Sequence, residues 1–299
     1  TGGAKLAAGM ADVVPPTELA VVANTGDDVE VYGAHVSPDP DLVTYWLAEV
    51  IDERGWGIEG DTWAVMDALE AAGRAPWFRL GDRDLALCLM RTERLAAGER
   101  LTSAHAAVVR GMGVQSAVLP MSDEPLRTHV RTPAGWRAFQ EFMIVDGAKA
   151  PIEAVEFRGA EAARPTPEVL DAIARADAIV IGPSNPVISI GPILAVPGMR
   201  KALAEARAPV VAVSPFVGGR AVKGPTEAFM DHTGHSLTAS GVAEAYAGVI
   251  DAIVADEPAE VPGVASLETP TLMDGREARR RLATATLELA SSLARSHGA

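Results

Sequence analysis

The sequence predicts an α/β protein with a mostly parallel sheet, and three observations lead to this fold class. Short, almost continuously apolar runs recur along the chain, the clearest being Leu19–Asn24, Ala178–Ile181 and Val210–Val213. Such runs are typical of strands buried on both faces, as in a parallel sheet covered by helices. Each run stops at residues that favour turns, and helical patterns fill much of the chain between the runs.

Helices are predicted where apolar residues repeat every three to four positions between start and stop signals. Thr166 before Pro167 is typical of an N-cap followed by proline at the first helical position. Thr226 opens a helix that Gly234 ends, and Asp274 precedes a long amphipathic helix. The predicted helices are Asp41–Ile51, Thr62–Ala72, Asp82–Ala96, Pro167–Ala176, Thr226–Thr233 and Asp274–Arg295.

The helical period disappears between about residues 114 and 158, where short turns separate β-rich segments. We therefore expect an antiparallel β insertion at about 114–158. Its predicted strands are Val114–Leu119, Thr128–Thr132, Trp136–Val145 and Ile152–Arg158. No repeat, low-complexity tract or long Pro/Ser linker divides the chain, so a single domain over residues 1–299 is predicted.

Composition narrows the function classes. The 299 residues are 48% hydrophobic and 22% charged, which suits a globular protein with a large core and excludes a disordered chain. Against 40 Asp and Glu there are 26 Lys and Arg, so the net charge is −14 and a nucleic-acid partner is not expected. A cleft can still collect local cations and backbone N–H groups around a small anion.

The one cysteine, Cys88, lies in the apolar segment 85–90, where core packing is its expected role. It excludes an internal disulfide and fits a cytoplasmic protein. Neither a signal segment nor an apolar run long enough to span a membrane is present, so no membrane partner is expected.

Four carboxylates follow the first predicted strand within fifteen positions. They are Asp27, Asp28, Asp39 and Asp41, near the strand end where open α/β sheets bind ligands. Such hard oxygen ligands suit Mg²⁺, and we predict that Asp27 and Asp41 are the metal ligands and catalytic residues. The alternative is that Asp27 and Asp28 are turn residues and that Asp39 or Asp41 caps the next helix.

Loops with few acids follow the other strands and are candidates for binding phosphate. Glycines permit close backbone approach to an anion, and lysine supplies a point charge. The alternatives are ordinary Gly-Pro and Asn-Pro turns and solvated charges at Arg220 and Lys223. The start, Thr1-Gly2-Gly3, fits the tail of a Gly-rich strand-to-helix turn, so a truncated start is expected. The predicted phosphate-binding residues are Gly2, Gly3, Ser184, Asn185, Gly218, Gly219 and Lys223.

The segment Gly81-Asp82-Arg83-Asp84 opens a predicted helix. From there Arg83 can reach towards an anionic or planar aromatic ligand. The alternative is a surface ion pair with Asp84 or Glu59. The six histidines show no metal-ligand spacing and no Gly-x-Ser-x-Gly elbow occurs, so zinc chemistry and a hydrolase triad are not predicted.

Taken in order, these segments resemble the 2-phospho-L-lactate transferase family of coenzyme F420 biosynthesis, which includes phosphoenolpyruvate-using relatives. The resemblance runs from Thr1 to about Val254. Its segments are Thr1-Gly2-Gly3-Ala4-Lys5-Leu6, Asn24-Thr25-Gly26-Asp27-Asp28, Ser37-Pro38-Asp39-Pro40-Asp41, Arg54-Gly55-Trp56-Gly57-Ile58, Leu80-Gly81-Asp82-Arg83-Asp84, Leu119-Pro120-Met121-Ser122-Asp123, Gly182-Pro183-Ser184-Asn185-Pro186, Ser189-Ile190-Gly191-Pro192-Ile193-Leu194 and Val213-Ser214-Pro215.

The resemblance implies a Rossmann-like fold, Mg²⁺ and a homodimer. It also implies a donor that is a guanosine diphosphate ester of lactate or enolpyruvate. The acceptor is 7,8-didemethyl-8-hydroxy-5-deazariboflavin (Fo), whose terminal ribityl hydroxyl attacks the phosphorus while GMP leaves. Asp41 and Arg83 fall on the acceptor side. Pro40 and Leu42 replace residues usual in the family, which puts a threonine hydroxyl role there in doubt.

A related superfamily of nucleotide-sugar-binding regulators is the alternative, because it shares the Gly-rich start and the sheet but binds without turnover. The segments Asp39–Asp41 and Gly81–Asp84, on the implied deazaflavin side, favour the enzyme. The donor stays open between lactyl and enolpyruvyl esters, although a composition rich in Ala, Arg and Val fits a GC-rich bacterium and the enolpyruvyl donor.

Overall fold

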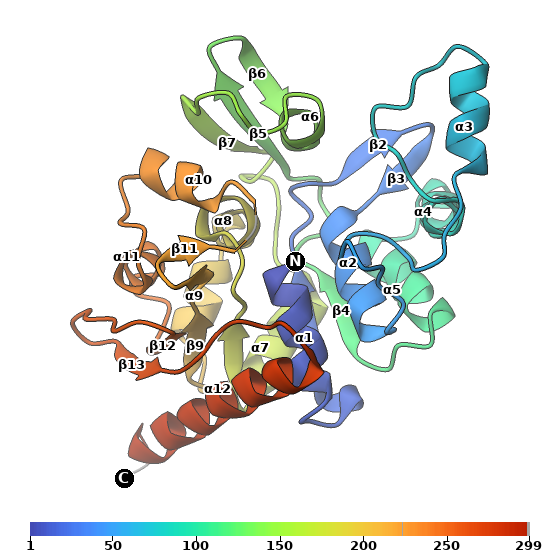
Figure 1. Ribbon diagram of the computed structural model, residues 1–299. Coiled ribbons are helices and arrows are strands. Elements are labelled where there is room, and N and C mark those ends of the chain that lie inside the picture. The colour runs from blue at the N-terminus through green and yellow to red at the C-terminus, as the bar shows by residue number, and fades with distance from the viewer. Residues whose placement is uncertain (223, 298–299) are drawn as a thin grey trace.

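The largest sheet of the described residues is a parallel four-stranded sheet with helices on both faces, at the lower left in Figure 1. The computed structural model describes residues 1–222 and 224–297. Its helices are α1 Gly2–Ala11, α2 Pro38–Leu47, α3 Ala64–Ala71, α4 Asp82–Ala96, α5 Leu101–Gly111, α6 Phe139–Ile144, α7 Pro167–Arg175, α8 Gly191–Ala195, α9 Met199–Ala204, α10 Thr226–His232, α11 Ala239–Ala245 and α12 Arg276–His297, with short turns of helix η1 Pro16–Glu18 and η2 Pro186–Ile190. Its strands are β1 Ala20–Ala23, β2 Val29–Val31, β3 Ala34–Val36, β4 Ala117–Pro120, β5 Arg127–Thr132, β6 Gly135–Ala138, β7 Ala154–Arg158, β8 Ile179–Ile181, β9 Val210–Val213, β10 Phe216–Val217, β11 Arg220–Ala221, β12 Ala252–Ala255 and β13 Ala265–Glu268.

The central sheet has the strand order β13-β12-β9-β8, and every neighbouring pair is parallel. Its side chains alternate between two cores, as a pleated strand requires. Val211 and Val213 pack with Leu6 of α1 and with α12, whereas Val210 and Ala212 join the core with α7, α9 and α11. The predicted α/β fold with a parallel, helix-covered sheet is confirmed.

Strand β4 corrects the first part of the predicted insertion. Residues 114–119 were expected in an antiparallel sheet, but β4 pairs in parallel with β1, with Ala20 opposite Ala117. The reason is helix α5, which the prediction missed. It returns the chain to the other end of the sheet, as a parallel connection needs.

The rest of the insertion is confirmed as an antiparallel sheet in the order β6-β5-β7. The predicted strand Trp136–Val145 is wrong beyond Ala138, because residues 139–144 form α6. Phe139 and Phe142, three positions apart on one helix face, pack around Phe229 in a buried cluster. That burial favours the helix over a longer strand.

Most predicted helices agree with the structure to within a few residues, and α4 matches Asp82–Ala96 in full. The predicted helix Asp41–Ile51 is shifted, because α2 begins at Pro38 and ends at Leu47. Ser37 is the N-cap residue and Pro38 takes the first helical position, where its missing N–H is no loss. Asp39 and Asp41 therefore lie in the first turn of α2.

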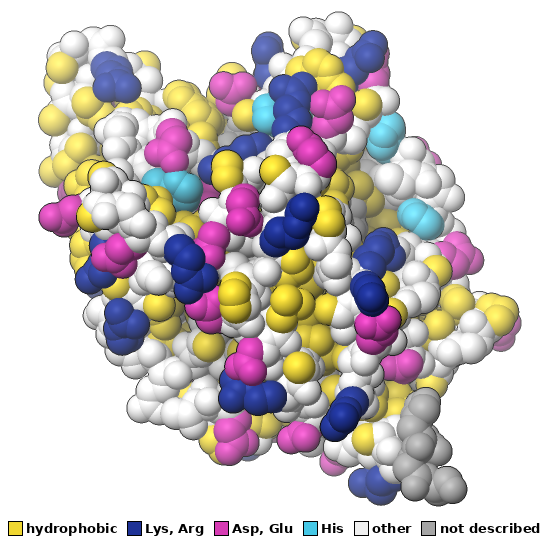
Figure 2. Space-filling view, turned by 180° about the vertical axis from the view of Figure 1, so that it is seen from behind, with side chains coloured by type: hydrophobic (Ala, Val, Ile, Leu, Met, Phe, Trp, Pro, Cys, Tyr) yellow, Lys and Arg dark blue, Asp and Glu magenta, His cyan; other side chains and the backbone are white. Residues whose placement is uncertain are grey.

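The hairpin β2–β3 packs with α3 and α4 around a separate core that contains Cys88, whose side chain is fully buried as expected. The α3 region and the antiparallel sheet project on two sides of a notch, seen from behind in Figure 2. Acidic and basic side chains are interspersed over that face. Within the described residues, no helix combines the length and apolar character needed to cross a membrane.

Candidate functional site

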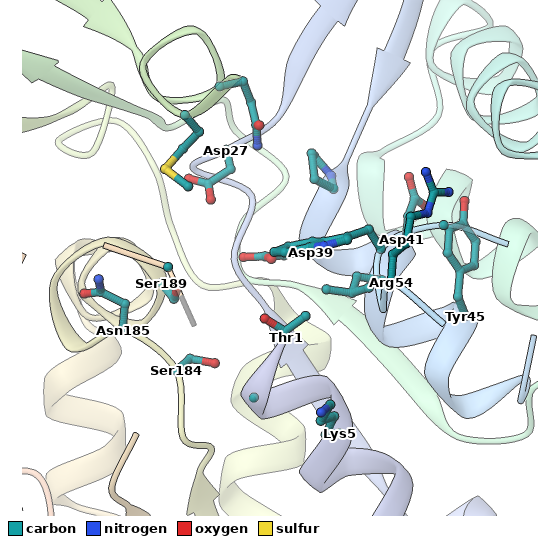
Figure 3. A pocket seen from close by; sticks show the side chains of 18 of the residues that line it. Thr1, Lys5, Asp27, Asp39, Asp41, Tyr45, Arg54, Ser184, Asn185 and Ser189 are labelled. Atoms are coloured by element: carbon teal, nitrogen blue, oxygen red, sulfur yellow. The ribbon is translucent and has the colours of Figure 1, made fainter. Parts of the chain in front are cut away.

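A cavity of about 550 Å³ lies at the carboxyl ends of the parallel strands, as open α/β sheets predict. The loops after β1, β8, β9 and β13 reach it, together with the first turns of α1 and α2. Helix α6 and parts of the segments 54–63 and 78–84 complete the lining. Figure 3 shows Asp27, Asp39, Ser184 and Asn185 around the same space.

Asp28, one of the four predicted carboxylates, is hydrogen-bonded to other side chains of the protein. It accepts hydrogen bonds from Ser37 Oγ at 2.7 Å and from His35 Nε2 at 3.0 Å. Burial lowers the pKa of His35, but the hydrogen bond and charge of Asp28 outweigh it, so the net pKa is raised. Asp28 therefore fixes the hairpin β2–β3 to the acidic loop.

Asp41 is also paired. Both of its carboxylate oxygens accept hydrogen bonds from the Arg91 guanidinium, at 2.7 Å each, and the Arg91 side chain is fully buried. Arg91 also donates to the carbonyl oxygen of His35. Acidic and thiol groups of Asp41, Asp84 and Cys88 lie within 4.8 Å of one another, but the Arg91 charge already balances Asp41. The geometry thus gives no support to Asp41 as a magnesium ligand, which stays a prediction.

Of the four predicted carboxylates, Asp27 and Asp39 remain for a ligand. The Oδ1 atom of Asp27 is buried without a hydrogen-bond partner. Burial first, and then the charge of Asp39, raises the pKa of Asp27 well above its usual value. The effect of the Asp39 charge on Asp27 places the two acids in one cluster, in which Asn24 Nδ2 also donates to Asp39 Oδ2 at 3.1 Å. Two neighbouring carboxylates with an unpartnered oxygen fit a divalent cation.

Gly26 and strand β5 hold this acidic loop in place. A Cβ at Gly26 would lie 2.7 Å from Thr128 Oγ1 and 2.9 Å from Asn24 Oδ1, so a larger residue would push the loop away. The Thr128 N–H donates to the Gly26 carbonyl at 2.7 Å. The antiparallel sheet thereby positions Asp27, a role of Thr128 that the prediction missed.

The predicted phosphate-binding residues of α1 and the loop after β8 do come together. The Gly3 N–H donates to Ser184 Oγ at 3.1 Å, and a Cβ on Gly2 would clash with the Pro183 carbonyl oxygen. Asn185 uses its Oδ1 to cap η2, through Val187 N at 2.9 Å. Its buried Nδ2 has no partner, so an N–H donor is available to an anion.

Gly218 and Gly219 are not brought to the cavity. They form the exposed turn between β10 and β11, where the Gly218 N–H donates to Asp256 at 2.7 Å. Lys223 lies outside the described residues. Their phosphate-binding roles stay predictions, which the placement of the two glycines does not support.

Arg83 does not line the cavity either. Its exposed side chain donates to the Glu59 carbonyl oxygen at 3.1 Å, close to the surface alternative given above. Three basic residues that the prediction passed over do line the cavity, namely Lys5, Arg54 and Arg79. Lys5 and Arg54 belong to segments that carry the family resemblance, which was the available signal for both.

Comparison with known proteins identifies the family. The sequence profile described as 2-phospho-L-lactate transferase CofD matches residues 1–285. The chain belongs to this family. It is 42% identical to a phosphoenolpyruvate transferase of Kitasatospora aureofaciens, over 98% of this chain and 96% of the relative. It is 39% identical to a 2-phospho-L-lactate transferase of Methanosarcina mazei, over 86% and 84%.

The solved structure of a UPF0052 family protein from Bacillus halodurans has the same fold, with a TM-score of 0.61 over 96% of both chains. At 19% identity this likeness confirms the fold of the transferase and nothing finer. The full-length matches confirm the resemblance drawn from the sequence. The chain is therefore a transferase of this family rather than a fold relative alone.

Behind the cavity of this transferase, His105 is held neutral. The Arg91 guanidinium lies 3.4 Å from His105 Nδ1, and the Thr44 hydroxyl, 3.3 Å from Nε2, gives its own proton to the Pro40 carbonyl. This arrangement fits an imidazole that carries its proton on Nε2. Burial is the main reason that the pKa of His105 falls to about 4.

Acidification should destabilise the transferase through His105. Because its folded pKa lies below the ordinary value of 6.5, its contribution is complete above pH 6.5 and is lost as the pH falls towards 4. We expect His105→Gln to flatten the loss of unfolding free energy between pH 6.5 and 4. Denaturant titrations at several pH values measure this. Equal slopes in the parent and the variant would contradict it.

Proposed function

We propose that the transferase moves a phosphoenolpyruvyl or 2-phospho-L-lactyl group from its guanosine diphosphate ester to the terminal ribityl hydroxyl of Fo. The observation that carries this proposal is one cavity with two chemically different sides. The acidic pair Asp27 and Asp39 faces the loops of Ser184 and Asn185, which offer N–H and O–H donors (Figure 3). Such a cavity suits an anionic donor and a hydroxyl acceptor.

In the proposed reaction, the acceptor hydroxyl oxygen forms a bond to the phosphorus that carries the lactyl or enolpyruvyl group. The bond from that phosphorus to the bridging oxygen of GMP breaks, and the hydroxyl proton is released. Asp27 and Asp39 would hold Mg²⁺, which neutralises the diphosphate charge when bound. The Gly3 and Ser184 region and the Asn185 amide bind and orient the diphosphate.

The enolpyruvyl ester is the donor to test first. Phosphoenolpyruvate transferases of Kitasatospora aureofaciens and Streptomyces griseus align with 98% of this chain, at 42% and 39% identity. The 2-phospho-L-lactate transferases of Methanosarcina mazei and Methanospirillum hungatei align with 86% and 90%, at 39% and 38%. A homodimer and a cytoplasmic location remain part of the proposal.

The direct test mixes the protein, Mg²⁺ and Fo with each guanosine-activated donor and identifies the products by mass. We expect GMP together with Fo carrying the transferred group, formed faster from the enolpyruvyl donor. Donor binding without any product from either ester would instead favour the non-catalytic nucleotide-binding alternative. Omission of Mg²⁺ in the presence of a chelator tests the metal.

Asn185→Asp should weaken GDP binding by at least about tenfold, an effect of about 1.4 kcal/mol. The new carboxylate keeps the oxygen that caps η2, but it replaces the unpartnered N–H donor with a negative charge facing the diphosphate. Calorimetric titration with GDP measures the effect, and unchanged Fo binding is the control. Parental GDP affinity in a folded variant would remove Asn185 from the donor side.

A further inference from the structure

At the start of α4 the cavity receives the side chain of Asp84, whereas Arg83 points to the exterior. Asp84 Oδ1 accepts a hydrogen bond from the Tyr45 hydroxyl at 2.7 Å, and the Cys88 thiol lies 3.7 Å from the same oxygen. No donor from the described residues reaches Asp84 Oδ2. The cavity therefore contains a carboxylate whose second oxygen is open to a ligand.

Asp84 has the charged neighbours Asp41, Arg91 and Asp61, whereas the cavity that it lines is more apolar than polar. The cavity lining also contains the buried residues Ile58 and Leu80 and the aromatic residues Trp63 and Phe78. A flat apolar ligand fits such walls, and a single polar group among them fixes its orientation. Burial raises the pKa of Asp84 to about 6, so the carboxylate is mostly ionised at pH 7 and acts as an acceptor.

We propose that Asp84 Oδ2 accepts a hydrogen bond from an O–H or N–H on the edge of the planar acceptor ring and so selects the acceptor. This inference rests on the proposed function, since Fo is the ligand that supplies the ring. The Fo ring carries such donors in its 8-hydroxyl and its riboflavin-type ring N–H. Asp84 is thus the residue of the Gly81–Asp84 segment that faces the acceptor, in the place first predicted for Arg83.

The decisive variant is Asp84→Asn. The Tyr45 hydroxyl still needs an acceptor, so it should hold the amide oxygen on its own side and turn the NH₂ group towards the cavity. A donor would then meet the donor of the ring, and we expect Fo to bind about 30-fold more weakly. GDP affinity and melting temperature should change little. Fo fluorescence and GDP calorimetry measure the two affinities.

A second variant distinguishes recognition of the Fo ring by Asp84 from a purely structural role of Asp84. Tyr45→Phe removes the hydroxyl that fixes the amide, so the amide of the double variant Tyr45→Phe/Asp84→Asn can turn its oxygen towards the ring. We expect the double variant to regain at least about threefold in Fo affinity over Asp84→Asn alone. A structural role for Asp84 predicts the reverse, because the second change would add to the damage.

Glu93→Gln is the matched control, since it neutralises an exposed carboxylate on the same helix. It should bind Fo as the parent does. Parental Fo affinity in a folded Asp84→Asn variant would overturn the inference, and so would a further loss in the double variant. Failure of the proposed function looks different, because the parent itself would then neither bind nor convert Fo.

Discussion

Asp27→Asn is expected to lower turnover by about 10³-fold and to leave the protein folded. Its carboxylate is the buried acid with an unpartnered oxygen at the cavity, beside Asp39. The amide has nearly the same size, but it lacks the negative charge that, in the proposed function, would hold Mg²⁺ beside the diphosphate. Steady-state rates with saturating donor and Fo measure the loss.

A thermal shift provides the control for the Asp27 prediction. Because burial raises the pKa of Asp27, the unfolded chain loses this proton more readily than the folded protein, so stability falls as the pH rises from the ordinary carboxyl pKa towards the raised one, and that loss is present at neutral pH. Without metal, Asp27→Asn should therefore melt no lower than the parent. Mg²⁺ should raise the melting temperature of the parent more than that of the variant. Near-parental turnover in the variant would remove Asp27 from the reaction.

The position of the site could be predicted from the sequence, because it follows from local signals. The predicted buried strands end at Asn24 and Ile181, and the loops that follow them carry Asp27, Ser184 and Asn185. Gly2 and Gly3 could be predicted as part of the site for a related reason, because glycines allow an anion to approach the backbone closely. Parallel strands then bring these loops to one edge of the sheet.

Which acid faces the ligand could not be predicted, because that choice depends on partners distant in the chain. Arg91 lies 50 residues from Asp41, and nothing in the spacing of α4 shows that its guanidinium is turned inward. The start of α2 at Pro38 was also missed, and it matters for this choice. It places Asp39 and Asp41 in one helical turn, where their side chains have different partners. The parallel pairing of β4 was missed likewise, because pairing partners are not local.

Asp41→Asn is expected to destabilise the protein by about 3 to 5 kcal/mol, a larger effect than for any other single change at the site. The Arg91 guanidinium is fully buried, and Asp41 is the carboxylate that it engages with two hydrogen bonds. A guanidinium keeps its proton in proteins, so Arg91 stays charged when Asp41 is replaced and cannot escape the loss by becoming neutral. Urea titrations of the parent and the variant measure the difference.

Removal of both charges should restore most of the stability. In Asp41→Leu/Arg91→Met, apolar side chains of similar length replace the ion pair, a change that is often neutral or stabilising in buried sites. We expect the double variant to recover at least half of the free energy lost in Asp41→Asn, which marks the loss as that of an uncompensated charge. An Asp41→Asn variant with the unfolding free energy of the parent would contradict the buried pair. If the double variant is stable and turns over Fo at the parental rate, Asp41 serves the fold, and its predicted catalytic role is wrong.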